Sequence, residues 1–424
     1  MSNINKKFYS NFLFYSLSIV IVGGINFISI PLIIENYGVT SYGEFSLVQN
    51  VVLILVSFGG GWLNQNILRF NNNSYSFKVI IFQYFYIVFI PLFFISLFIF
   101  VFLKYNVVIA TLGAFTIFLG GVTALMYSFF QSRMNAKSNI VLDLSRVVTF
   151  VIILFLFPIF KINDYHLLYI VFAFFISYFV AFLVKIKFFL RIIIILFKDY
   201  FKSIKNIKLK LLKNKYLIDY GWPLSLWFTV SSLLNVADRY IIDFFLSNET
   251  VGRYSAIYDL LYKAITIVCA PILAAGYPVI AKHYNSDEPK KAYSFIRNLI
   301  LLEIVGLCII VIVAYYLRGF FIINVARLSL TQENIELVIP ILIGAMLWQI
   351  SMLLHKPLEL RKETKKMLIF IIIAFAFNLI TNFIFIPIYG VIFAAYSTIL
   401  SSMIYLLLNL FYVLITNKYR LLKI

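Results

Sequence analysis

The stretch Asn235-Val-Ala-Asp238-Arg239-Tyr-Ile-Ile-Asp243 places two carboxyl groups and one guanidinium group inside a long apolar segment of the 424-residue chain. Charged side chains are costly in an apolar environment, so the few that occur there are usually functional. A polar loop, residues 247–255, follows after a few apolar residues. We therefore expect a membrane bundle in which these charges have a role.

The same loop echoes an earlier stretch, residues 37–46. Similar residues recur at one offset, the 209 positions that separate Gly43 from Gly252, which is close to half of the chain. The matching pairs are Asn26 with Asn235, Gly43 with Gly252, Phe45 with Tyr254, and Ser46 with Ser255. An internal repeat of this length is typical of a duplicated membrane bundle, so we predict two similar halves.

The composition excludes a soluble domain. Hydrophobic residues make up 63% of the chain and charged residues only 12%, whereas a soluble domain has about 25% charged residues. Such a chain cannot cover a water-facing surface, which makes the lipid bilayer its solvent. The net charge of +19 does not indicate nucleic-acid binding, because the Lys and Arg residues lie between apolar segments, as membrane topology signals do.

The residues that soluble enzymes use are missing or scattered. Cys269 and Cys308 lie singly in apolar segments, which excludes a disulfide framework, a metal cluster and a cysteine nucleophile. His166, His283 and His355 are far apart and lack zinc-like spacing, and no phosphate-binding loop occurs. We therefore expect neither an enzyme nor a metal protein.

Twelve apolar segments are long enough to cross a bilayer, for which about 20 residues are needed. They make the expected fold an all-α membrane protein of twelve transmembrane helices. The first segment is too long for a signal-peptide core and lacks a cleavage site, so we expect it to be retained. The segments are roughly 11–34, 45–68, 78–103, 107–130, 139–160, 165–187, 220–246, 254–280, 296–317, 335–355, 367–388 and 391–416.

The distribution of positive charge predicts the orientation, with both termini in the cytoplasm. The expected outer loops hold only a few of the 36 basic residues, namely Lys104, Lys161, Arg253, Arg318 and Arg327. We expect an N-terminal lobe of six helices at 1–190, a basic amphipathic linker at 191–218 and a C-terminal lobe of six helices at 219–424. The linker is typical of a helix lying on the anionic inner leaflet, although a docking site for a cytoplasmic partner is an alternative.

Intramembrane charges are the main functional candidates, and each basic residue has an acidic neighbour within one helical turn. Two interpretations stay open. The pairs either fix helix packing, or line a water-filled cavity and exchange partners when an anionic substrate arrives. The pairs are Asp143 with Arg146, Arg239 with Asp243, and Asp259 with Lys263.

The depth of the basic residues favours a route for a phosphate-bearing group. At about 1.5 Å per residue, they are staged from the cytoplasmic mouth to the outer third of the membrane, and guanidinium groups bind phosphate oxygens in a bidentate fork. The candidate substrate-binding residues are Arg69, Arg146, Arg239, Lys263, Asn26 and Asn235. The candidate ion-coupling residues are Asp259, Glu303, Asp238 and Asp243.

Several of these motifs resemble one known family. Asp238-Arg239-Tyr-Ile-Ile, followed by Val251-Gly252-Arg-Tyr-Ser255, looks like the start of the second half of the O-antigen (Wzx-like) flippases. These form the polysaccharide-transporter branch of the multidrug/oligosaccharidyl-lipid/polysaccharide exporter superfamily. Also similar to the family are residues 37–46, Ile67-Leu-Arg69-Phe70, Gln131-Ser-Arg133, and Pro271 with Pro278.

The resemblance implies two six-helix lobes in a V around a central cationic cavity. It implies a flippase that moves undecaprenyl-diphosphate-linked oligosaccharide, such as an O-antigen unit of lipopolysaccharide, across the bacterial inner membrane by alternating access. The only counter-ion expected is a proton or sodium, with no other cofactor. Expected partners are membrane lipids and the polysaccharide polymerase and chain-length proteins. The resemblance assigns diphosphate or sugar contacts to Arg69, Arg239 and Lys263, and depth alone adds Arg146.

Two rival functions fit the sequence less well. A multidrug/cation antiporter of the same superfamily would need a cavity dominated by acids and aromatic rings, against which the buried basic residues argue. A membrane-embedded glycosyltransferase or polymerase would need a large outer loop, whereas the longest one expected here, 318–334, is short.

Overall fold

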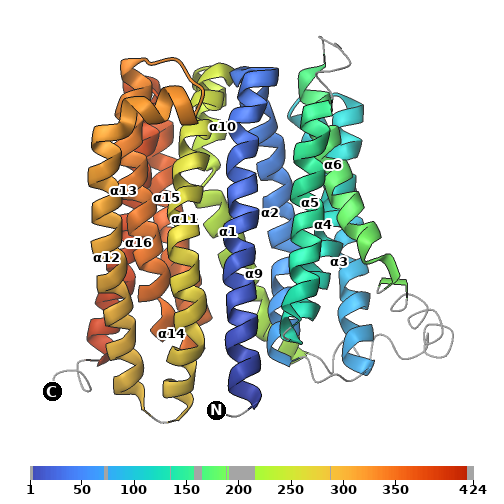
Figure 1. Ribbon diagram of the computed structural model, residues 1–424, viewed down its shortest axis with the longest axis vertical. Coiled ribbons are helices and arrows are strands. Elements are labelled where there is room, and N and C mark those ends of the chain that lie inside the picture. The colour runs from blue at the N-terminus through green and yellow to red at the C-terminus, as the bar shows by residue number, and fades with distance from the viewer. Residues whose placement is uncertain are drawn as a thin grey trace. The chain divides into compact units, whose positions relative to one another are not determined.

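The computed structural model describes residues 3–70, 75–133, 135–156, 165–187, 189–190, 215–286 and 288–417. Within these ranges the chain is built from helices joined by short turns (Figure 1). The predicted all-α class is confirmed. The principal elements are α1 (Asn3–Tyr37), α2 (Val39–Phe70), α3 (Tyr75–Phe102), α4 (Val107–Ser132), α5 (Ala136–Leu156), α6 (His166–Val184), α9 (Lys215–Leu234), α10 (Ala237–Phe245), α11 (Asn248–Asn285), α12 (Pro289–Phe320), η3 (Phe321–Val325), α13 (Gln332–Leu354), α14 (Lys356–Leu360), α15 (Thr364–Tyr389) and α16 (Ile392–Asn417).

Eleven helices in the described part of the chain are long and apolar enough to cross a membrane. The twelfth expected segment, 220–246, is interrupted. It consists of α9 and the nine-residue α10, which are separated by a turn at Asn235 and Val236. Breaks of this kind are typical of transporter helices that carry a functional site.

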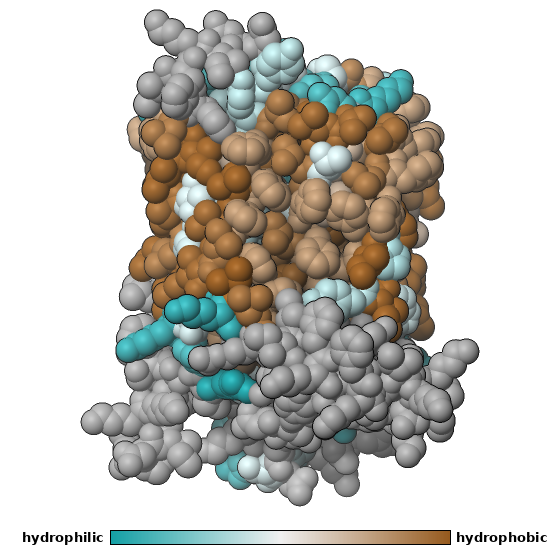
Figure 2. Space-filling view, turned by 90° about the vertical axis from the view of Figure 1, so that its right-hand side faces the viewer, coloured by the Kyte–Doolittle hydropathy of each residue, from teal (hydrophilic) through white to brown (hydrophobic). Residues whose placement is uncertain are grey.

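The exposed apolar surface is that of a membrane protein. On α3, the side chains of Phe94, Phe98 and Phe102 are 63%, 71% and 74% exposed. Figure 2 shows a face with a continuous apolar belt across its middle and polar residues towards its ends. Because so much apolar surface is unfavourable in water, this belt fits a lipid environment.

The chain forms two compact units, which we call unit 1 (Met1–Leu47 and Leu233–Ile424) and unit 2 (Val48–Ser232). In unit 1, α13 packs against α11, α12 and α16, and α1 packs against α11. In unit 2, α4 packs against α3, α5 and α6. The lobes expected at 1–190 and 219–424 are defined by the sequence repeat, whereas these units are defined by contacts. The two lobes therefore stay a prediction. Most of the expected linker, 191–214, lies outside the described residues.

The two copies of the repeated motif contact each other within unit 1. The chain turns from α1 into α2 at Gly38, whose φ of 88° suits glycine. The first turns of α2 then pass directly against the first turns of α11. A Cβ atom on Gly43 would lie 2.4 Å from the Asn248 carbonyl oxygen, and one on Gly252 would lie 2.1 Å from the Val39 carbonyl oxygen. Both glycines are therefore required by close backbone approach.

Replacing Gly252 by alanine is expected to destabilise the protein by about 1–3 kcal/mol, because the added methyl group meets backbone that cannot move aside cheaply. The thermal midpoint in detergent micelles measures this. Gly306→Ala on α12 is the matched control, since a Cβ atom there meets nothing within 4 Å. Equal midpoints for the two variants would show that the backbone crossing is not tight.

Candidate functional site

A buried group of polar side chains joins three helices of unit 1, and we call it the arginine cluster: Tyr42 and Ser46 of α2, Arg239 of α10 and Asp259 of α11. Arg239 Nη2 lies 2.6 Å from Asp259 Oδ1, and Nη1 lies 3.2 Å from Oδ2, which makes the ion pair bidentate. Nη1 also donates to Ser46 Oγ at 2.6 Å, and the Tyr42 hydroxyl donates to Asp259 Oδ2 at 2.6 Å. The Arg239 side chain is only 3% exposed. The charge is therefore neutralised within the helix bundle.

The break between α9 and α10 positions this arginine. Because α10 begins at Ala237, Arg239 lies in its first turn, where α10 packs against α11. Next to it, Asp238 is buried and accepts hydrogen bonds from the Tyr254 hydroxyl and from the Arg239 backbone N–H. The guanidinium carbon lies 5.2 Å from the centre of the Tyr258 ring. Aromatic and carboxylate groups thus hold the guanidinium from several sides.

The expected pair of Arg239 with Asp243 is wrong. Among the described residues Arg239 forms its ion pair with Asp259 of the next helix, and Asp243 is exposed on α10. A bidentate partner in a buried position is more favourable than an exposed neighbour one turn away. Lys263, one turn further along α11, acts electrostatically on the same Asp259 carboxylate, as its spacing predicted.

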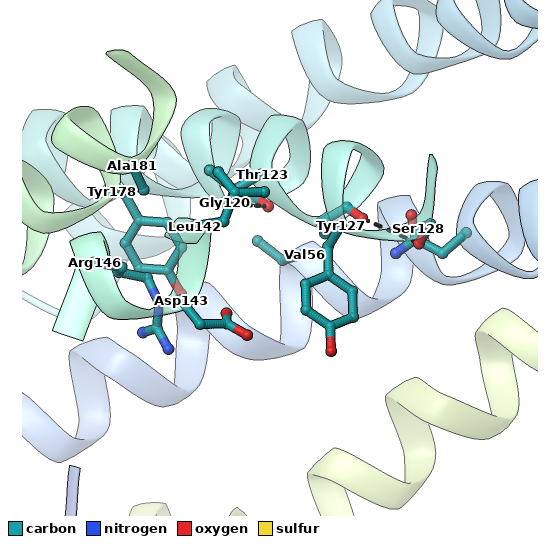
Figure 3. A pocket seen from close by; sticks show the side chains of 12 residues that line it. Val56, Gly120, Thr123, Tyr127, Ser128, Leu142, Asp143, Arg146, Tyr178 and Ala181 are labelled. Atoms are coloured by element: carbon teal, nitrogen blue, oxygen red, sulfur yellow. Dashed lines mark hydrogen bonds between the residues drawn. The ribbon is translucent and has the colours of Figure 1, made fainter. Parts of the chain in front are cut away.

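A second polar site is a cavity of about 280 Å³ inside unit 2. It is lined by residues of α2, α4, α5 and α6, among them Asp143, Arg146 and Tyr178. The Arg146 guanidinium carbon lies 5.2 Å from the centre of the Tyr178 ring. Figure 3 shows the Arg146 guanidinium and the Asp143 carboxylate extending to the same side. The two charges expected on one face of this helix therefore both line a cavity.

The remaining predicted residues are spread over several helices. Asn235 lies at the break before α10 and accepts a hydrogen bond from the Tyr258 hydroxyl at 3.1 Å. Asn26 is on α1, where its carbonyl oxygen accepts from Ser29 Oγ. Glu303 of α12 is 3% exposed, and its Oε2 has no hydrogen-bond partner among the described residues. Arg69 is on α2, but its side chain lies outside the described part.

Sequence reasoning missed the hydroxyl groups of both sites. Tyr254, Tyr258 and Tyr262 follow one another at four-residue spacing on α11, and the rings of Tyr258 and Tyr262 are stacked with centres 5.6 Å apart. This spacing places all three on one helix face, which was a usable signal. Tyr42 carried no comparable signal, because its partner is 217 residues away.

The sequence profile of the family described as "Polysaccharide biosynthesis protein" matches residues 8–284, which include the whole arginine cluster. The chain belongs to this family. No curated protein matches the sequence. The predicted resemblance is confirmed at the level of this polysaccharide biosynthesis family.

The fold of this polysaccharide biosynthesis family member is shared with solved structures of two kinds of transporter. "Lipid II flippase MurJ, inward closed conformation" has a TM-score of 0.71 at 16% identity, over 95% of this chain and 87% of that one. A point mutant of the Vibrio cholerae MATE transporter VcmN has a TM-score of 0.66 at 13% identity, over 97% of both chains. An inward-facing multidrug resistance MATE transporter of the MOP superfamily has a TM-score of 0.60 at 14% identity, over 97% of this chain and 96% of that one. The chain is thus a multi-pass membrane protein with a transporter fold.

Replacing Asp259 by alanine is expected to cost about 3–5 kcal/mol, because it leaves the Arg239 guanidinium buried without its carboxylate. The thermal midpoint in micelles measures the loss. Asp243→Ala on the exposed side of α10 is the matched control and should change it little. The double variant Arg239→Met/Asp259→Leu should recover much of the stability. A single variant as stable as the control would contradict a buried, neutralised pair.

Proposed function

We propose that this chain is a flippase that moves undecaprenyl-diphosphate-linked oligosaccharide, an O-antigen unit or a similar surface polysaccharide unit, from the cytoplasmic to the periplasmic leaflet of the bacterial inner membrane. The observation that carries the proposal is the occurrence of basic side chains in the membrane-spanning helices of a polysaccharide biosynthesis family member. Its fold is shared with a lipid II flippase.

In this proposal the anionic head group binds to the basic residues one after another. Arg69, Arg146, Arg239 and Lys263 are the contacts for the diphosphate or sugar, with Asn26 and Asn235 as neutral contacts. A diphosphate that reaches Arg239 can replace the Asp259 carboxylate, since both are bidentate acceptors for a guanidinium. The exchange keeps the Arg239 charge neutralised and leaves the Asp259 carboxylate to Lys263 and the Tyr42 hydroxyl. It is the step that would couple substrate binding to helix movement.

We propose that a proton or sodium gradient drives alternating access. The acidic candidates are Asp259, Glu303, Asp238 and Asp243. Glu303 is supported by its burial and by its oxygen without a partner among the described residues. We propose cytoplasmic termini, and membrane lipids, a polysaccharide polymerase and chain-length proteins as partners.

A multidrug/cation antiporter is the second candidate, because the MATE transporter VcmN shares the fold. Basic groups in the spanning helices are unfavourable for an organic cation, which places this function second. Dye efflux from cells that carry the chain, abolished by Asp259→Asn, would favour it.

Replacing Lys263 by glutamine is expected to slow flipping at least tenfold, the effect of losing roughly 1.4 kcal/mol of interaction with the diphosphate. The rate is measured in proteoliposomes with a fluorescent undecaprenyl-diphosphate oligosaccharide and a membrane-impermeant quencher. Lys263→Arg should retain transport, and Arg318→Gln at the end of α12 is the control.

Arg239→Ala/Lys263→Ala tests the route itself. Because loss of Arg239 also destabilises the bundle, the inserted amount must be matched by quantitative blotting before rates are compared. Undiminished flipping by this double variant would contradict the proposal that the diphosphate binds to these basic residues.

A further inference from the structure

The cavity of unit 2 has walls from four helices and a mixed polar and apolar lining. Asn64 comes from α2, Tyr127 from α4, Asp143 and Arg146 from α5, and Tyr178 from α6. Apolar wall is supplied by Val56, Leu142 and Ala181. The residues that could contact a ligand thus converge from elements far apart in the sequence.

The hydrogen-bonding groups of the cavity are of both kinds. The Arg146 guanidinium can only donate, and an ionised Asp143 carboxylate can only accept. Asn64, which also lines the cavity, carries an amide group that both donates and accepts.

These groups argue against a diphosphate as the occupant. A diphosphate offers acceptor oxygens and negative charge, so it would pair with Arg146 but would be repelled by an ionised Asp143 carboxylate. An organic cation is also unfavourable in this cavity, because the Arg146 guanidinium would repel it. A neutral polyol satisfies all three groups, since each hydroxyl both donates and accepts.

The size of the cavity points to a single ring. Its 280 Å³ lies just below the usual range of about 300–1,000 Å³ for ligand pockets. That volume suits one sugar ring and not a whole oligosaccharide. The ring of Tyr178 supports the Arg146 guanidinium from one side, which holds the donor in place before a ligand arrives. The C–H faces of a sugar can pack on the apolar wall.

We propose that this cavity is a sugar subsite, in which Asp143, Arg146 and Asn64 bind the hydroxyl groups of one ring of the lipid-linked oligosaccharide and so select its sugar. The inference rests on the proposed flippase function and deepens it. It gives Arg146 a sugar contact in place of a diphosphate contact, and it separates sugar recognition in unit 2 from the arginine cluster in unit 1.

The test compares two probes on the full chain in lipid nanodiscs: undecaprenyl diphosphate without sugar, and the lipid-linked oligosaccharide extracted from cells that carry the protein. Asn64→Leu and Asp143→Asn are expected to weaken binding of the oligosaccharide lipid at least about tenfold, the effect of losing a hydrogen bond to a buried or charged group. Binding of undecaprenyl diphosphate should not change.

Asn50→Leu is the matched control, because Asn50 is also buried on α2 but does not line the cavity. It should alter neither binding constant, and the thermal midpoint of each variant reports its folding. Equal weakening of both probes, or no effect on either, would overturn the sugar subsite while leaving the flippase proposal intact. Failure of the unmodified protein to bind either probe would overturn the flippase proposal and the subsite with it.

Discussion

The bidentate pair of Arg239 with Asp259 is the interaction on which the structure of unit 1 depends. A guanidinium buried among helices is tolerated only when its charge is matched, and here the Asp259 carboxylate matches it while Ser46 Oγ also accepts from Nη1. Arg239 of α10 thus binds both Asp259 of α11 and Ser46 of α2, which connects three helices at one point. The Tyr240 hydroxyl, which donates to the Leu47 carbonyl oxygen at 2.9 Å, adds a second tie between α10 and α2.

The break between α9 and α10 makes this arrangement feasible. In an uninterrupted helix the position of Arg239 would be fixed by the helix as a whole, whereas a nine-residue segment can be placed by its own contacts. Asp238 then accepts a hydrogen bond from the Tyr254 hydroxyl and completes the packing of α10 on α11. The break in the helix and the buried charge thus occur at the same place. This is expected, because non-helical backbone in a membrane protein is tolerated only where it is shielded from lipid.

Much of the fold could be predicted because apolar length is a strong signal. Each expected segment overlaps a helix or, for 220–246, a pair of helices. The ion pairing could not be predicted, because spacing within a helix compares residues up to four apart, and Asp259 lies 20 positions from Arg239. In the cavity, the shared face of Asp143 and Arg146 was visible in the sequence. The role of Tyr178 was not, since aromatic residues make up 19% of the chain and one more tyrosine carries no signal.

The contact of Gly43 with Gly252 also determines how far the hydroxyl groups of α2 reach. Tyr42 precedes Gly43, and Ser46 lies three residues further along the same helix. A side chain at either glycine would push the first turns of α2 away from α11, and the Tyr42 and Ser46 hydroxyls would then move away from Asp259 and Arg239. Two glycine hydrogen atoms therefore set the geometry of an ion pair to which neither glycine contributes a ligand.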